Sequence, residues 1–211
     1  MSAVRPLVAV ALGTALALAG TALSGCAKHA ADPVMAARPD DMSLGDSKAK
    51  VQVIEYASAS CPHCAQWNAE VFPVFRAKYV DTGKVRYTLR EYLTDPEAIA
   101  AAGFMLARCA GKDRYFPVLD AVFKGQDEMV ATKDVKGVLA RIAKDPGGLT
   151  DAQFDACMRD TAAEKALEAR VDRHEHVDKI ESTPTFIING KRIEGEMTLP
   201  ELDAAIAQAA G

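Results

Sequence analysis

Two cysteines separated by two residues, Cys61-Pro62-His63-Cys64, offer the most specific chemistry in this sequence of 211 residues. They follow the β-rich stretch 51–56 and open a segment whose apolar residues recur at helical spacing. At the start of a helix, unpaired backbone N–H groups and the helix dipole stabilise a thiolate. We therefore expect Cys61 to be a redox nucleophile and Cys64 to be the thiol that closes the disulfide. Pro62 suits a first helical turn, and His63 places a hydrogen-bond donor or a positive charge beside Cys61.

A C-x-x-C pair is also half of many zinc sites, which need two further ligands at matching spacing. The other histidines are His29, His174 and His176. His29 lies in a polar stretch near the N-terminus, and His174 and His176 are two positions apart on a predicted helix, so they point in different directions. We expect these two to be solvent-exposed helix histidines, and we predict neither a metal site nor a cofactor.

The chain begins with the features of an export signal. Residues 7–23 form an apolar stretch behind Arg5, which has the build of a secretory signal peptide and is marginal in length for a membrane span. It ends in Leu23-Ser24-Gly25-Cys26, which resembles the lipobox of bacterial lipoproteins and implies cleavage after residue 25 and acylation of Cys26. A plain cleaved signal and an uncleaved anchor are the alternatives. We expect residues 26–43 to be a flexible tether that holds the protein to one of the membranes facing the periplasm.

The elements that must position the cysteines follow from the pattern after residue 44. Residues 44–95 read as strand, helix and strand, with the cysteines where the first strand meets the helix. Residues 96–180 contain no convincing strand, and the helices expected there lie near 96–109, 113–124, 132–144, 151–158 and 162–180. Capping boxes mark two of these helix starts, Thr150 with Gln153 and Thr161 with Glu164.

A strand, a hairpin and a helix end the chain. Residues 185–188 read as a strand, Asn189-Gly190 is a strong two-residue hairpin turn, and residues 191–193 return as its partner. Thr198 and Glu201 then cap the last helix. We therefore predict an α/β domain in two parts, 44–95 and 181–211, interrupted by an all-helical subdomain.

Composition supports one folded domain and argues against one class of partner. Hydrophobic residues make up 49% of the chain and charged residues 26%, which is ordinary for a globular protein. The formal net charge is -4, and this mild acidity gives no reason to expect a nucleic acid as partner.

The order of these features resembles the DsbA-like branch of the thioredoxin superfamily over about residues 43–211. The resemblance rests on the strand before C-P-H-C, the helical block, Thr183-Pro184 before a strand, and the closing hairpin and helix. It implies a thioredoxin-like fold in which the Thr183–Pro184 bond is cis and lines the substrate groove beside Cys61. It also implies that Glu55, six positions before Cys61, lies beneath Cys64. A carboxyl buried there could relay the proton of Cys64, and a solvated strand carboxylate is the alternative.

The resemblance further implies a function. We expect a dithiol oxidase that donates its disulfide to exported proteins with cysteines, acts as a monomer, and is reoxidised by a DsbB-like membrane partner. An isomerase or reductase is the alternative among enzymes, since Thr183 before the proline is found in such proteins. Residues 26–43 are, however, too short for the dimerisation domain that those isomerases carry. A non-catalytic binding lipoprotein is the alternative from another class.

Cys109 and Cys157 remain, one in each of two predicted helices of the inserted block. In an oxidising compartment we expect them to form a structural disulfide that closes a loop of about 49 residues. Two buried free thiols and a second redox-active pair are the alternatives.

Overall fold

A computed structural model of the chain describes Met1 and residues 33–211. The expected signal peptide, the expected lipidation site Cys26 and the first part of the expected tether lie outside the described residues. Within residues 33–211, five strands form one mixed sheet in the order β1-β3-β2-β4-β5, in which β2 and β3 are parallel and the other neighbours antiparallel. The strands are β1 (Met42–Leu44), β2 (Val51–Ala57), β3 (Val85–Glu91), β4 (Thr185–Ile188) and β5 (Lys191–Glu194).

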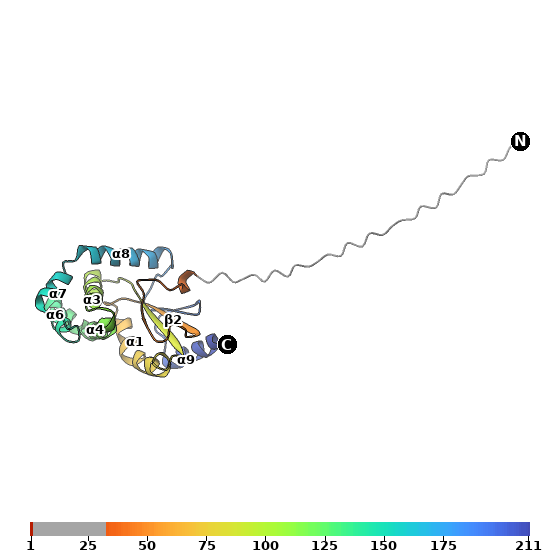
Figure 1. Cartoon of the computed structure of the whole chain (residues 1–211), viewed down its shortest axis with the longest axis horizontal. Coiled ribbons are helices and arrows are strands. Elements are labelled where there is room, and N and C mark those ends of the chain that lie inside the picture. Colours follow the sequence, from red (N-terminus) through yellow and green to blue (C-terminus); the bar gives the residue numbers. More distant parts are fainter. Residues whose placement is uncertain (2–32) are drawn as a thin grey trace. The chain divides into compact units, whose positions relative to one another are not determined.

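Helices occupy the connections between these strands. Between β2 and β3 lie α1 (Pro62–Glu70), α2 (Phe72–Phe75) and a π-helical turn, η2 (Arg76–Val80). The helices between β3 and β4 are α3 (Glu97–Cys109), α4 (Lys112–Lys124), α5 (Gln126–Thr132), α6 (Val135–Lys144), α7 (Asp151–Cys157) and α8 (Thr161–His176), and α9 (Leu199–Ala210) follows β5. Figure 1 shows α3, α4, α6 and α7 gathered to one side of the sheet, with α8 running back over them. The predicted fold class, a thioredoxin-like α/β fold with a helical insertion, is confirmed.

Strands β2, β3 and β4 are buried on both faces, as expected for a sheet with parallel strands at its centre, whereas the edge strand β5 is mostly exposed. Side chains alternate along β2, so Val53 and Ala57 join the main core, which includes Trp67. Tyr56 belongs to a second, smaller cluster on the other face. That second cluster is covered by Val34, which precedes the sheet in sequence. Among the described residues, no helix has the length and apolar character needed to span a bilayer.

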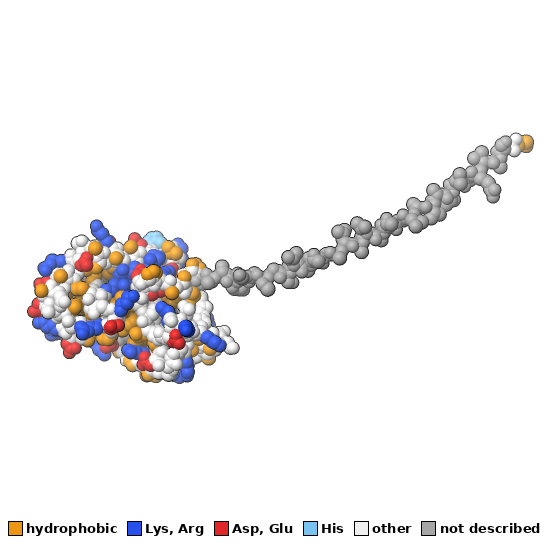
Figure 2. Space-filling view, in the orientation of Figure 1, with side chains coloured by type: hydrophobic (Ala, Val, Ile, Leu, Met, Phe, Trp, Pro, Cys, Tyr) orange, Lys and Arg blue, Asp and Glu red, His pale blue; other side chains and the backbone are white. Residues whose placement is uncertain are grey.

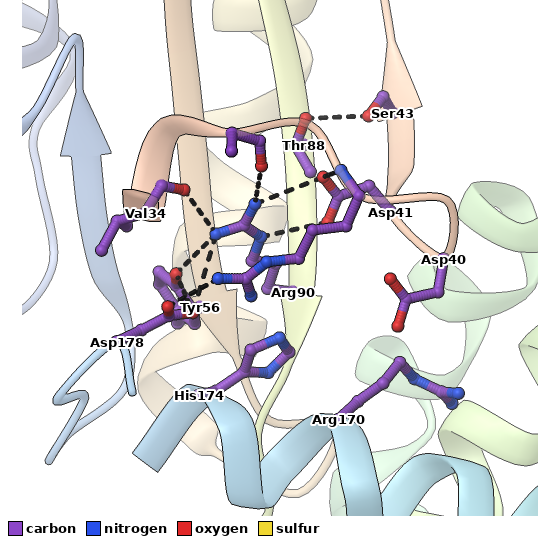
Figure 3. A network of polar contacts seen from close by, with 12 residues as sticks. Val34, Asp40, Asp41, Ser43, Tyr56, Thr88, Arg90, Arg170, His174 and Asp178 are labelled. Atoms are coloured by element: carbon purple, nitrogen blue, oxygen red, sulfur yellow. Dashed lines mark hydrogen bonds and ion pairs between the residues drawn. The ribbon is translucent and has the colours of Figure 1, made fainter. Parts of the chain in front are cut away.

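The segment before β1 is docked on the domain, which differs from the predicted tether of 26–43. Arg90 of β3 is only 2% exposed. Its guanidinium donates hydrogen bonds to the carbonyl oxygens of Val34 (2.7 Å) and Ala36 (3.0 Å), and its Nε donates to the carboxylate of Asp41 (3.0 Å). Figure 3 shows this guanidinium enclosed by the segment on one side and by Tyr56 on the other. A buried charge needs such partners, and a sequence pattern gives no sign of them. Residues 33–43 therefore belong to the folded domain and not to a tether.

Glu91, the last residue of β3, attaches the helical insertion to the sheet. Its buried carboxylate accepts hydrogen bonds from Arg108 of α3 (2.5 Å), Arg170 of α8 (2.6 Å) and Tyr115 of α4 (3.1 Å). The carbonyl oxygen of Glu91 lies 2.7 Å from Nδ1 of His174. His174 is only 2% exposed, so the prediction of an exposed histidine is wrong for this residue and holds for His176.

Two helix boundaries in the insertion also differ from the prediction. The helix expected over 132–144 begins only at Val135, because Lys133 adopts a left-handed conformation (φ 58°) and Asp134 caps α6; α5, which ends at Thr132, was not predicted. The start of α8 is capped by Asp160, whose carboxylate accepts the N–H groups of Ala162 and Ala163, so Thr161 forms no capping box. The capping box of Thr150 is present. The structure joins Cys109 of α3 to Cys157 of α7 in a disulfide, with 6.2 Å between their Cα atoms.

Candidate active site

The site begins where β2 ends. Its chain continues through a short loop into α1, and Cys61 is the N-cap residue of that helix, with extended backbone angles (φ -77°, ψ 120°). Pro62 occupies the first turn, where its missing N–H leaves no hydrogen bond unmade. Cys61 is 6% exposed and Cys64 is fully buried, and both carry free thiols. Both thiols are therefore largely buried, and only Cys61 keeps some contact with solvent.

The two thiols have opposite tendencies to ionise. The pKa of Cys61 is lowered from 9.0 to about 5, first by a hydrogen bond from the Cys64 thiol, then by Thr183 and the backbone N–H groups of Cys64 and His63, which together outweigh burial. Burial, the hydrogen bond to Cys61 and the nearby carboxyl of Glu55 raise the pKa of Cys64 well above its usual value. One thiol is thus ionised at neutral pH and the other is protonated, an asymmetry that suits attack by one and resolution by the other.

Glu55 lies on the sheet face that carries α1. It is 2% exposed, and Tyr87 donates a hydrogen bond to its Oε2 at 2.5 Å. Burial raises the pKa of this carboxyl from 4.5 to about 8, because the effect of burial exceeds that of the Tyr87 hydrogen bond. At neutral pH the group is therefore a carboxylic acid that holds a proton below the two sulfurs.

His63 extends away from the two sulfurs toward the C-terminal part of the chain. Its side chain is 69% exposed, and Nδ1 lies 2.5 Å from Oε1 of Glu196. The loop that carries Glu196 is fixed by Trp67 of α1, whose indole N–H donates to the carbonyl oxygen of Met197 at 3.0 Å. Trp67 is therefore a core residue that also positions one side of the site.

Thr183 and Pro184 lie opposite the first cysteine. The peptide bond between them is cis, and Sγ of Cys61 lies 3.6 Å from the carbonyl oxygen of Thr183. The hydroxyl of Thr183 is buried without a hydrogen-bond partner in the part of the chain that the structure describes. It is therefore free to donate to the Cys61 thiolate. The structure thus brings the sequence-predicted residues Glu55, Cys61, Cys64, Thr183 and Pro184 together, while His63 points outward.

Gln126 is a site residue that the sequence does not reveal. It lies at the start of α5 and is 8% exposed, and its side-chain amide donates to the carbonyl oxygens of Ala59 (2.8 Å) and Cys61 (3.3 Å). It connects the helical insertion to the loop that presents the nucleophile. No spacing or motif marks it, because its partners are backbone atoms more than 60 positions earlier.

No third ligand for a metal joins the two cysteines among the described residues. The cluster of potential metal ligands found there consists of Asp172, Glu175 and His176, at the end of α8. It contains neither Cys61 nor Cys64.

Comparisons with known proteins agree with this geometry. The family described as Thioredoxin matches residues 37–208. A curated relative from Rickettsia bellii, provisionally named a protein-disulfide oxidoreductase, is 32% identical over 171 residues, which cover 81% of this chain. The crystal structure of alpha-DsbA1 from Wolbachia pipientis is similar, with a TM-score of 0.75 and 28% identity over 83% of this chain and 94% of that one. BdbD from Bacillus subtilis shares the fold (TM-score 0.69, 19% identity, 80% of this chain and 92% of that one).

The chain spans 64% of the length of the Rickettsia bellii relative, and 57% of a second relative, from Rickettsia typhi, to which it is 31% identical over 74% of its own length.

Proposed function

The chain belongs to the thioredoxin family, in its DsbA-like branch, and from this we propose that it is a thiol–disulfide oxidoreductase that oxidises cysteine pairs in exported proteins. The observation that supports this most directly is the asymmetry of the two thiols, with Cys61 ionised at the start of α1 and Cys64 protonated beneath it. In this proposal Thr183 and Pro184 contact the substrate, and Cys109–Cys157 is structural.

Oxidation of a substrate would proceed in two exchange steps. A substrate thiolate attacks the sulfur of Cys61 in the Cys61–Cys64 disulfide, and Cys64 departs with a proton that Glu55 can supply. A second thiolate of the substrate then attacks the substrate sulfur of the mixed disulfide, and Cys61 departs as a thiolate. The substrate loses two electrons and gains a disulfide, and the protein gains both electrons. A low pKa makes Cys61 a good leaving group in the second step.

The direction of exchange follows from the stability of the thiolate. At pH 7 a thiol with a pKa of about 5 is almost fully ionised. Relative to an ordinary thiol, this stabilises the reduced protein by about 2.7 kcal/mol. For a two-electron couple that corresponds to about 60 mV toward the oxidising side. Such a protein gives up its disulfide readily.

The reduction potential, measured by equilibration with glutathione, tests the oxidase proposal. The reactive cysteine of thioredoxin has a pKa of about 7, so we expect a value about 50 mV more oxidising than that of thioredoxin, which lies near -270 mV. A potential at or below that of thioredoxin would overturn the oxidase assignment. It would favour the reductase or isomerase alternative, which the threonine at position 183 supports.

Cys61→Ser should abolish exchange with a model peptide, and unchanged activity would favour a non-catalytic binding role. Cys64→Ala should trap substrates as mixed disulfides for identification by mass spectrometry.

We also propose the location and partners that the N-terminus suggests. A lipid on Cys26 would hold the protein to a membrane facing the periplasm as a monomer, where a DsbB-like membrane protein could reoxidise it. The leader 7–23 and the sequence that ends in Cys26 support this proposal. In cells fed radioactive palmitate, the protein should become labelled and Cys26→Ser should remove the label. Labelling of the variant, or an unlabelled wild-type protein, would contradict the lipid anchor.

A further inference from the structure

A pocket that plays no part in the exchange chemistry lies at the end of the sheet farthest from Cys61. β2 starts at Val51 and runs toward the active site, and its seven residues correspond to about 20 Å. At its starting end a pocket of about 490 Å³ opens between the loop 48–51, the turn that precedes β3, and the last turn of α9. This pocket and the reactive sulfur therefore lie at opposite ends of the sheet.

Three lysines surround an apolar interior in this pocket. Lys48, Lys50 and Lys84 are exposed at its rim, while Val51 and Ile206 contribute buried apolar side chains. Within residues 33–211, none of the three lysines forms an ion pair, whereas several other surface lysines pair with a nearby aspartate. Lysine and arginine are interspersed with acidic side chains on the face drawn in Figure 2, and the whole chain carries a net charge of -4. The rim of this pocket is therefore positively charged, although the chain as a whole carries a net negative charge.

Asn189 holds the two walls of this pocket together. Its Oδ1 accepts the backbone N–H of Gln52 at 2.8 Å, and its Nδ2 donates to the carbonyl oxygens of Lys50 and Ala209, each at 3.2 Å. One side chain thus fixes the loop before β2 to the last turn of α9. The pocket is a built part of the fold.

We propose that the face formed by Lys48, Lys50, Lys84 and the pocket between them binds the surface of a membrane rich in anionic phospholipid. Lysines pair with lipid phosphates, and an apolar hollow accepts the region below the headgroup, which is the combination that holds proteins at anionic bilayers. The chain outside the described residues fits this occupant. Seven peptide units separate Cys26 from Pro33 and reach at most about 24 Å, so a lipid on Cys26 would keep the domain near the bilayer. In this orientation Cys61 faces away from the membrane and stays open to substrates.

Binding to vesicles tests the proposal without the lipid anchor. The full chain carrying Cys26→Ser is mixed with vesicles of phosphatidylcholine containing roughly 30% of the anionic phospholipid phosphatidylglycerol, or with vesicles of phosphatidylcholine alone. Each lysine near an anionic surface contributes roughly a factor of five. We therefore expect the triple change to glutamine at the three rim lysines to weaken binding to the anionic vesicles about a hundredfold. All variants carry the same leader, so a difference in vesicle binding between them comes from the residues changed on the lysine face.

A matched control removes the same charge elsewhere. Lys112, Lys133 and Lys165 are exposed on the helical insertion and form no ion pair among the described residues, and their triple change to glutamine should weaken binding no more than about twofold. Ala207→Glu places a carboxylate at the pocket on an exposed helix position and should weaken binding about tenfold or more without altering the fold. Melting temperatures of the variants show whether the lysines serve instead to stabilise the carboxyl end of α9.

Three results would overturn the proposal. The first is equal binding of the protein to anionic and to neutral vesicles. The second is an equal loss of vesicle binding in the rim triple variant and in the control triple variant. The third is that an acidic peptide binds this face more tightly than anionic vesicles do. Peptide oxidation measured on the same preparations is independent of the face. A failure of the membrane proposal therefore leaves the redox proposal intact, and the reverse also holds.

Discussion

Replacing Glu55 by glutamine removes an ionisable group from the centre of the sheet and keeps the shape of the side chain. The carboxyl has a pKa of about 8 in the folded protein against 4.5 for an ordinary glutamate. Between these two values the unfolded chain releases this proton and the folded chain retains it. The folded state therefore loses stability as the pH rises from 4.5 to 8, relative to a chain that lacks the group.

The size of this effect follows from the difference between the two pKa values. Because each pKa unit corresponds to about 1.36 kcal/mol, the loss is about 3 kcal/mol at pH 7 and about 5 kcal/mol above pH 8. Glu55→Gln should therefore raise the free energy of unfolding over wild type by about 3 kcal/mol more at pH 7 than at pH 4.5. Glutamine can still accept the hydrogen bond that Tyr87 donates. The variant cannot supply a proton to Cys64, so release of Cys64 from the disulfide should slow below pH 8.

Urea unfolding of the reduced protein at a series of pH values measures the stability difference, and stopped-flow fluorescence with a thiol peptide measures the exchange. Comparing variant with wild type at each pH cancels the contribution of the Cys61 thiolate. Glu70→Gln, at an exposed position near the end of α1, is the matched control and should leave both quantities unchanged. A difference between variant and wild type that stays constant from pH 4.5 to 8 would refute the reasoning, because Glu55 would then be ionised inside the fold.

Three further predictions concern the helical insertion. Burial lowers the pKa of His174 from 6.5 to about 4, so the folded state should lose about 3 kcal/mol as the pH falls from 6.5 to 4. In urea titrations His174→Gln should remove that slope and His176→Gln should not. Replacing Cys109 and Cys157 by serine should lower the free energy of unfolding by about 4 kcal/mol, from the lost constraint between two residues 48 positions apart in the sequence, and a change below about 1 kcal/mol would contradict a structural role. Glu91→Gln leaves two arginines without their buried partner and should cost about 3 to 5 kcal/mol in the same assay.

The parts of the fold that could be predicted are those in which neighbours in sequence decide the structure. The hairpin at Asn189 and Gly190 and the capping boxes of Thr150 and Thr198 depend on hydrogen bonds across a few residues. The dithiol motif likewise defines its own position, because the first cysteine of a C-x-x-C that follows a strand caps a helix.

Burial of polar groups could not be predicted in this way. Arg90 lies in a strand that reads as ordinary from its sequence, and its partners belong to a segment about 50 positions earlier that has no periodic pattern. His174 was expected in water for the same reason, since the helix around it is rich in charged residues and the carbonyl oxygen it contacts is 83 positions away. The role of Gln126 depends on two backbone carbonyl oxygens that no side-chain pattern reports.

The sequence by itself determined which atoms react, because the attacking and resolving sulfurs are set by their order along one helical turn. The pKa values that direct the chemistry depend instead on desolvation and on groups brought together from distant segments: Glu55 from β2, Thr183 from the loop before β4, and Tyr87 from β3. Only the tertiary structure decided these, since the free energy of a charge depends on everything that surrounds it in space and a linear pattern records only its neighbours in the chain.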